Sequence, residues 1–203
     1  MTTTVLLARH GQTNSNVDSF FAGRCDEDLN DVGYAQVRSL SARLAGLPIA
    51  SVYTSPLRRT YITATILAEP HGLGLEVIDD FNEIQLGDWQ GLYADGIGQR
   101  WPELWQRSRI DPSELTIPGG ESFSQVTERA VRAFQTVVAS NQGKQVVVVT
   151  HDIIVRVLVA HILGVTNSIY RRFEIGNASL SMIRIVNGDA RLITLNDTSH
   201  LEA

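Results

Sequence analysis

The sequence of 203 residues contains a single cysteine, and this scarcity excludes two kinds of architecture. Cys25 has no partner for a disulfide bond, so neither a disulfide framework nor a zinc site built on cysteines is available. Its acidic neighbours Asp26, Glu27 and Asp28 disfavour the thiolate, so a reactive thiol is not expected. The chain is long enough for one well-buried domain and short for two.

Long apolar runs and an excess of positive charge are also missing. No apolar run approaches the length that spans a membrane, and Met1–Thr4 carries no basic residue of a signal peptide. We therefore expect no membrane partner and a cytoplasmic protein. The formal net charge of −5 argues against nucleic acid as the main partner. It does not exclude phosphate esters, because a local arginine cluster decides the field in a pocket.

The sequence lacks internal repeats, low-complexity segments and linkers, which predicts one domain over residues 1–203. What is present is an alternation of apolar runs and helical patterns, typical of a three-layer α/β/α sandwich around a mostly parallel sheet. We predict strands at residues 5–8, 49–54, within 72–79 and 145–150, the last of them central. We predict helices at residues 32–44, 56–68, 122–137 and 153–163, and a hairpin around Asn187-Gly188.

Three helix starts carry recognisable signals. Asn30 is an expected N-cap, and Ser122 with Gln125 forms a capping box. Ser55 is expected to cap a helix whose first residue is Pro56. The least regular part, residues 92–119, holds two tryptophans and three prolines. We interpret it as an excursion from the core that partly covers the crevice at the strand ends, with its tryptophans as a packing face.

The stretch Leu6–Asn16 organises the rest of the chain. An apolar strand ends there and delivers Arg9 and His10 to the sheet edge where ligands bind in open α/β folds. Gly11 permits close backbone approach, and the following residues can open a helix with free amides for an anion. A guanidinium, an imidazole and free amides describe a phosphate pocket. The alternative is structural, a salt-bridged arginine and a hydrogen-bonded histidine at a strand end.

Two further junctions bring charged or titratable residues to the same strand ends: Arg58-Arg59 after the second strand and His151 after the central one. Each junction alone is weak evidence, but together they favour phosphoryl transfer. Paired arginines mask the charge of a phosphate so that a neutral imidazole can attack phosphorus. A leaving alkoxide needs a proton, and Glu83 is the available carboxylic acid. The sequence lacks a P-loop and an H-E-x-x-H pattern, and we expect neither a metal nor a cofactor.

These residues stand in motifs that span nearly the whole chain. The segment R-H-G-Q-T-x-x-N at residues 9–16 resembles the R-H-G-E/Q-T-x-x-N signature of the histidine phosphatase superfamily, whose fold is phosphoglycerate-mutase-like. Further matching motifs are G-R-C-D-E-D-L-N-D at 23–31, S-P-L-R-R-T at 55–60, E-I-Q-L-G-D-W-Q-G at 83–91, G-G-E-S at 119–122 and V-T-H at 149–151. The chain looks most similar to bacterial metal-independent phosphoserine phosphatases, although Leu86 stands where those proteins carry a histidine on the substrate side.

The resemblance implies a role for each matching position. His10 is the implied nucleophile that becomes phosphohistidine, and Glu83 the implied acid–base carboxylate. The phosphoryl group is implied to bind to Arg9, Arg59 and His151, with Asn16 beside them and Gly23 in the segment lining the substrate side.

Two neighbours of these positions need comment. Arg58 is then the solvated neighbour of the binding arginine. Asp152 departs from the family, which commonly has glycine after the second histidine. A carboxylate beside the phosphate repels it unless it points away or caps the following helix. We expect the capping role, with the Asp152 backbone amide still able to face the phosphate.

The function we expect is a metal-independent phosphatase that hydrolyses small phosphomonoesters, such as phosphoserine, through phosphohistidine. A cofactor-dependent mutase of the phosphoglycerate type is the alternative on the same fold. A non-catalytic phosphate-binding regulatory module is the alternative of another class. The partner is a small phosphorylated metabolite, and the edge of the C-terminal hairpin offers a surface for a homodimer.

Overall fold

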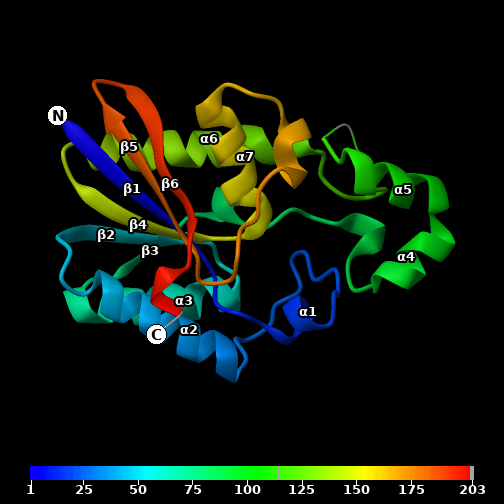
Figure 1. Ribbon diagram of the computed structural model, residues 1–203, viewed down its shortest axis with the longest axis horizontal. Coiled ribbons are helices and arrows are strands. Elements are labelled where there is room, and N and C mark those ends of the chain that lie inside the picture. The colour runs from blue at the N-terminus through cyan, green and yellow to red at the C-terminus, as the bar shows by residue number, and fades with distance from the viewer. Residues whose placement is uncertain (114, 202–203) are drawn as a thin grey trace.

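The core is a six-stranded sheet in the order β3-β2-β4-β1-β5-β6, seen in a computed structural model that describes residues 1–113 and 115–201 (Figure 1). The parallel strands are β1 (Thr2–Arg9), β2 (Ile49–Thr54), β3 (Leu75–Val77) and β4 (Gln145–Thr150). The hairpin strands β5 (Leu180–Val186) and β6 (Asp189–Asp197) join antiparallel to β1. The predicted mostly parallel sheet is confirmed.

Strand β4 lies at the centre because its side chains are apolar toward both faces of the sheet. Val146 to Val149 are all at most 1% exposed, as expected for a run of β-branched residues covered on two sides. In the parallel pair of β1 and β4, Arg9 is level with Thr150. The residues that follow these two strands therefore emerge side by side.

Two helices cover each face of this sheet. Helices α2 (Asp31–Leu44) and α3 (Arg58–Ala68) pack on one side, and α6 (Phe123–Ser140) and α7 (Asp152–Leu163) on the other (Figure 1). Each pair has its own apolar core, because alternate residues of β1 and β4 point to opposite faces. The apolar stripe of α6 faces inward, and its buried residues include Phe123, Val126, Ala130, Phe134 and Val137. The three-layer prediction is confirmed.

The helix starts follow the predictions at two of three places. The Asn30 side chain accepts a hydrogen bond from the Gly33 amide (2.8 Å), and Ser122 with Gln125 forms the capping box. The prediction for Ser55 is wrong: α3 begins at Arg58, and its N-cap residue, Leu57, makes no side-chain cap bond. Ser55 is fully buried, and its hydroxyl lies 2.7 Å from both Thr60 Oγ1 and His151 Nε2, whereas the Leu57 amide reaches it only at 3.4 Å. The hydroxyl is therefore part of a buried side-chain network instead of a helix cap.

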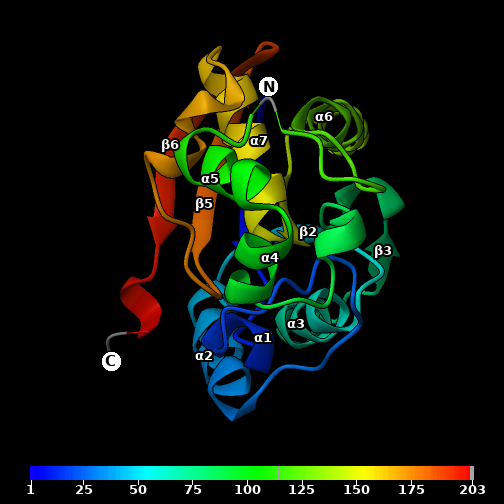
Figure 2. The ribbon, with the colours of Figure 1, turned by 90° about the vertical axis from the view of Figure 1, so that its right-hand side faces the viewer.

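The segment 92–119 forms α4 (Ala94–Arg100) and α5 (Pro102–Ile110), which lie beyond the carboxyl ends of the parallel strands together with α1 (Asn14–Val17) (Figures 1 and 2). Trp105 of this segment packs against Phe21 and Trp89, and its ring centroid lies 5.7 and 5.9 Å from theirs. The C-terminal turn, Ser199–Leu201, packs against α2.

Some expectations remain untested by the fold. Over the described residues 1–113 and 115–201, every helix is too short or too polar to span a bilayer. The single domain, the cytoplasmic location and the homodimer stay predictions.

Candidate active site

His10 lies just past the end of β1, and hydrogen bonds fix both its backbone and its ring. Its backbone amide donates to Thr150 O (3.0 Å), and its carbonyl accepts from the Ala178 amide (3.0 Å). The ring atom Nδ1 lies 2.7 Å from Gly11 O. Since a carbonyl can only accept, Nδ1 carries the proton and Nε2 keeps its lone pair. His10 therefore has the tautomer that a nucleophile attacking through Nε2 needs.

His151 lies just past the end of β4, and the register of the two strands brings it to His10. The two ring centroids are 5.3 Å apart. His151 Nε2 lies 2.7 Å from the Ser55 hydroxyl. Its Nδ1 is buried and has no hydrogen-bond partner among the described residues. A buried polar atom is normally paired, so this nitrogen is placed for a group that arrives with a ligand.

Two arginines provide positive charge beside the histidines. The Arg59 guanidinium donates to Cys25 O and Gly23 O (both 2.8 Å) and is 2% exposed as a residue. Arg9 donates from Nη1 to Ile175 O (2.6 Å), and its buried Nε has no partner among the described residues. Both guanidinium groups are thus anchored by neutral carbonyls, and within the part of the chain that the structure describes neither forms an ion pair with a carboxylate.

Arg58, which precedes Arg59 at the start of α3, lies at the surface instead. Arg58 binds Asp28 at the surface, and its side chain is 61% exposed. The structure therefore separates the buried Arg59 from its solvated neighbour, as predicted.

Burial and charge set the protonation states at the site. Burial, with the nearby Arg59 charge, lowers the pKa of His10 well below its usual value, and the same causes lower the pKa of His151. Both rings are therefore neutral at pH 7. Burial raises the pKa of Glu83, and the charge of Asp152 adds to the rise. A carboxyl that holds its proton more firmly than usual is suited to act as a general acid.

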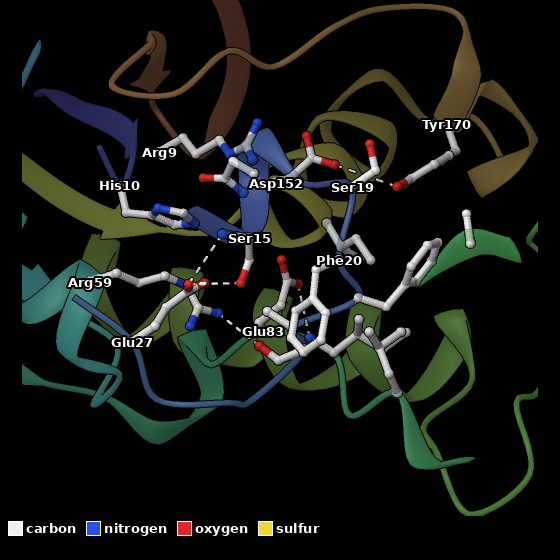
Figure 3. A pocket seen from close by; sticks show the side chains of 18 of the residues that line it. Arg9, His10, Ser15, Ser19, Phe20, Glu27, Arg59, Glu83, Asp152 and Tyr170 are labelled. Atoms are coloured by element: carbon white, nitrogen blue, oxygen red, sulfur yellow. Dashed lines mark hydrogen bonds between the residues drawn. The ribbon is translucent and has the colours of Figure 1, made fainter. Parts of the chain in front are cut away.

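A crevice of about 450 Å³ opens above these groups (Figure 3). Six of the residues predicted from the sequence line it: Arg9, His10, Asn16, Gly23, Arg59 and Glu83. His151 is fully buried and lies against the His10 ring instead of lining the opening. The Asn16 Oδ1 accepts bonds from the Thr13 amide and the Asn177 side chain, which leaves its own amide hydrogens for a ligand.

The prediction that Asp152 caps α7 is wrong. His151 is the N-cap residue of that helix, and Asp152 lines the crevice. Its carboxylate accepts from Arg156 Nε (3.0 Å) and from the Tyr170 hydroxyl (3.4 Å), as Figure 3 shows for Tyr170. Arg156 lies one turn further along the helix and offsets the charge, so the carboxylate can remain near an anion site.

Several lining residues were not found from the sequence. Glu27 accepts hydrogen bonds from Ser15 Oγ (2.7 Å) and Thr13 Oγ1 (3.0 Å), and so fastens the loop after α1 to the site (Figure 3). Aromatic and basic side chains of the outer wall come from distant segments: Phe20, Phe21, Trp105, Arg109 and Tyr170. The only sequence signal for this wall was the irregular stretch 92–119.

The described residues, 1–113 and 115–201, contain no group of three or more His, Cys, Asp or Glu side chains placed to hold a metal ion.

Comparison with known proteins agrees with this geometry. The sequence model of the histidine phosphatase superfamily (branch 1) matches residues 5–198. This chain therefore belongs to the histidine phosphatase superfamily, and the predicted membership is confirmed.

Individual proteins resemble the chain over nearly its full length. Phosphoserine phosphatase 1 of Hydrogenobacter thermophilus is 32% identical over 97% of this chain and 93% of its own. A bifunctional protein of Mycobacterium tuberculosis is 35% identical over 98% of this chain, which spans 55% of that relative's length. Among solved structures, YhfR of Bacillus stearothermophilus superposes with a TM-score of 0.95 at 29% identity, covering 98% of this chain and 99% of its own. The predicted class, a phosphoric monoester hydrolase, agrees with the name of the Hydrogenobacter thermophilus relative.

Proposed function

We propose that the chain is a metal-independent phosphatase that hydrolyses small phosphomonoesters through a phosphohistidine at His10. One observation carries the proposal. A buried neutral imidazole with a free Nε2 lies against a second neutral histidine and beside two arginines anchored by carbonyl oxygens, in a crevice that also holds a carboxyl whose pKa is raised by burial. Phosphoryl transfer needs these parts: a nucleophile, cationic donors and an acid.

The first step breaks the ester bond. The Nε2 lone pair of His10 attacks phosphorus, and the bond from phosphorus to the alcohol oxygen breaks with its electron pair on oxygen. Arg9 and Arg59 hold the equatorial oxygens. The Ser55 hydroxyl donates to His151 Nε2, which leaves Nδ1–H to donate to a phosphoryl oxygen. Glu83 gives its proton to the departing alkoxide.

The second step regenerates the enzyme. Water enters the place that the alcohol has left, and the Glu83 carboxylate takes a proton from it. The oxygen attacks phosphorus, and the bond between phosphorus and Nε2 breaks. Inorganic phosphate then leaves, with His10 neutral and Glu83 protonated again. Proton and charge balance over the two steps.

The substrate is a small phosphorylated metabolite, because the crevice of about 450 Å³ holds a phosphate and an alcohol of modest size. Phosphoserine is the first candidate because a relative that this chain matches over 97% of its length is named a phosphoserine phosphatase. Leu86 lines the crevice at the position where the phosphoserine phosphatases that the chain resembles carry a histidine on the substrate side. Recognition of serine by this chain therefore depends on other side chains.

Phosphate release from phosphoserine, 3-phosphoglycerate, sugar phosphates and p-nitrophenyl phosphate, measured in EDTA, tests the proposal. The wild type is expected to release phosphate, and His10→Ala to lower kcat by about 10⁴-fold or more, since loss of a nucleophile is among the most severe changes. Quenching with denaturant at alkaline pH during turnover should trap a phosphorylated protein whose label is stable in base, is lost in acid and maps to His10. Phosphoryl migration without net release would identify a mutase. Phosphate binding with no turnover at all would identify a regulatory module.

A further inference from the structure

Apart from Arg9 and Arg59 at the base of the crevice, Arg109 also lines it with a positively charged side chain. Arg109 lies in the last turn of α5 and lines both the crevice and an adjoining apolar cavity of about 240 Å³. Its guanidinium carbon lies 5.7 Å from the centroid of the Trp105 ring. A guanidinium that stacks on a ring keeps the N–H groups of its edge free to donate.

The platform beneath this cation is fixed. Trp105 packs against Phe21 and Trp89, and the Ser108 hydroxyl donates to Trp105 O (2.8 Å). Arg171 donates from Nη2 to Ser108 O (2.8 Å), which ties the end of α5 to the wall that carries Tyr170. The Arg109 side chain therefore extends from a helix end that is held at several points.

The carboxyl groups that line the crevice already have hydrogen-bond or ion-pair partners. Asp152 pairs with Arg156, Glu27 accepts from Thr13 and Ser15, and the Glu83 carboxyl accepts from the Ile84 amide. Among residues 1–113 and 115–201, no carboxylate forms an ion pair with Arg109. The outer wall of the crevice thus carries an uncompensated positive charge, separate from the two arginines at the base.

We propose that Arg109 recognises a carboxylate on the alcohol part of the substrate, so that the enzyme prefers phosphomonoesters of carboxylate-bearing alcohols. This inference rests on the proposed phosphatase function and adds a specificity residue to it. A second phosphate group is the other anion that could bind. The base meets its phosphate with two arginines, whereas a single planar guanidinium matches one carboxylate in a bidentate pair.

Two substrate pairs that differ only by the carboxylate test the proposal: 3-phosphoglycerate with glycerol 3-phosphate, and phosphoserine with phosphoethanolamine. In the wild type, kcat/KM favours the carboxylate member of each pair. Arg109→Met keeps apolar contact with Trp105 and removes the charge, so this preference should fall about tenfold, mostly through KM. Arg107→Met is the matched control, since Arg107 is an exposed arginine of the same helix that does not line the crevice. It should leave both preferences unchanged.

Calorimetry separates this inference from the proposed function. In a His10→Ala background the four esters bind without turnover, and Arg109→Met should weaken only the carboxylate members by about tenfold. Equal weakening of all four esters, or no preference in the wild type, overturns the inference even if p-nitrophenyl phosphate is hydrolysed. An effect confined to 2,3-bisphosphoglycerate also overturns it in favour of a second phosphate. If the binding preference holds while no ester is hydrolysed, the phosphatase proposal fails and the carboxylate site remains.

Discussion

The base of the crevice and its outer wall are built from different parts of the molecule. His10, Arg59 and His151 follow β1, β2 and β4 and are at most 3% exposed. Trp105 and Arg109 belong to α5, outside the layered core, and remain partly or largely exposed. The base is positioned by the sheet and by long-range hydrogen bonds, whereas the wall is positioned by aromatic packing. We infer that the base determines the reaction and the wall determines which alcohol is accepted.

The largest expected effect belongs to the base. Arg59→Ala removes a buried cation that faces the phosphoryl group, so kcat/KM should fall by about 10³-fold for every phosphomonoester, whatever its alcohol. Arg58→Ala is the control from the adjacent position, because its side chain is 61% exposed and its ion pair with Asp28 lies at the surface. Steady-state kinetics on three unrelated esters would check this. A loss of kcat/KM that depends strongly on the alcohol would contradict the inference that the base determines the reaction and the wall determines which alcohol is accepted.

A smaller and more selective effect is expected at Glu83, which lies between base and wall. Glu83→Gln cannot give a proton to the leaving group, so kcat for alkyl phosphates should fall by about 10²-fold. p-Nitrophenyl phosphate has a good leaving group and should lose much less. Equal losses for both substrate types would show that Glu83 positions the substrate instead of protonating the alkoxide.

The smallest effect is expected in the pH profile. The negative charge of Asp152 raises the pKa of Glu83, and the general acid is active when protonated, so activity falls as pH rises through that pKa. Asp152→Asn removes the charge but can still accept from Arg156. The pKa of Glu83 should then be lower, and the basic limb of kcat for an alkyl phosphate should move to lower pH.

The exposed residue Asp95 on α4 provides the control, since Asp95→Asn should leave the limb in place. A limb that moves to higher pH in Asp152→Asn would contradict the assignment of Glu83 as the acid.

Much of the base could be predicted from the sequence because it depends on strand ends. Apolar runs locate β1 and β4, and the residues that follow parallel neighbours meet at one edge. His10 and His151 were therefore predictable as a pair, although 141 positions separate them by their numbering.

The rest could not be predicted because tertiary contacts overrode local signals. Ser55 followed by Pro56 has the pattern of a helix cap, yet its hydroxyl binds His151, a partner 96 positions away. Asp152 has the right position for a cap, yet Arg156 and Tyr170 hold its carboxylate in the crevice. The outer wall uses irregular segments whose packing leaves no periodic pattern to detect.

The hydrogen bonds on the His10 carbonyl determine when, during synthesis of the chain, His10 becomes fixed in place. His10 leaves the ribosome long before Ala178 and Asn177, whose backbone N and side-chain Nδ2 hold the His10 carbonyl. Strand β1, which precedes His10, likewise has its neighbours in the sheet only after β4 and β5 have been synthesised. Contacts of such wide separation form late and slowly. A nascent chain that already contains every proposed catalytic side chain is therefore still without a fixed nucleophile, and activity appears only when the C-terminal hairpin has been added.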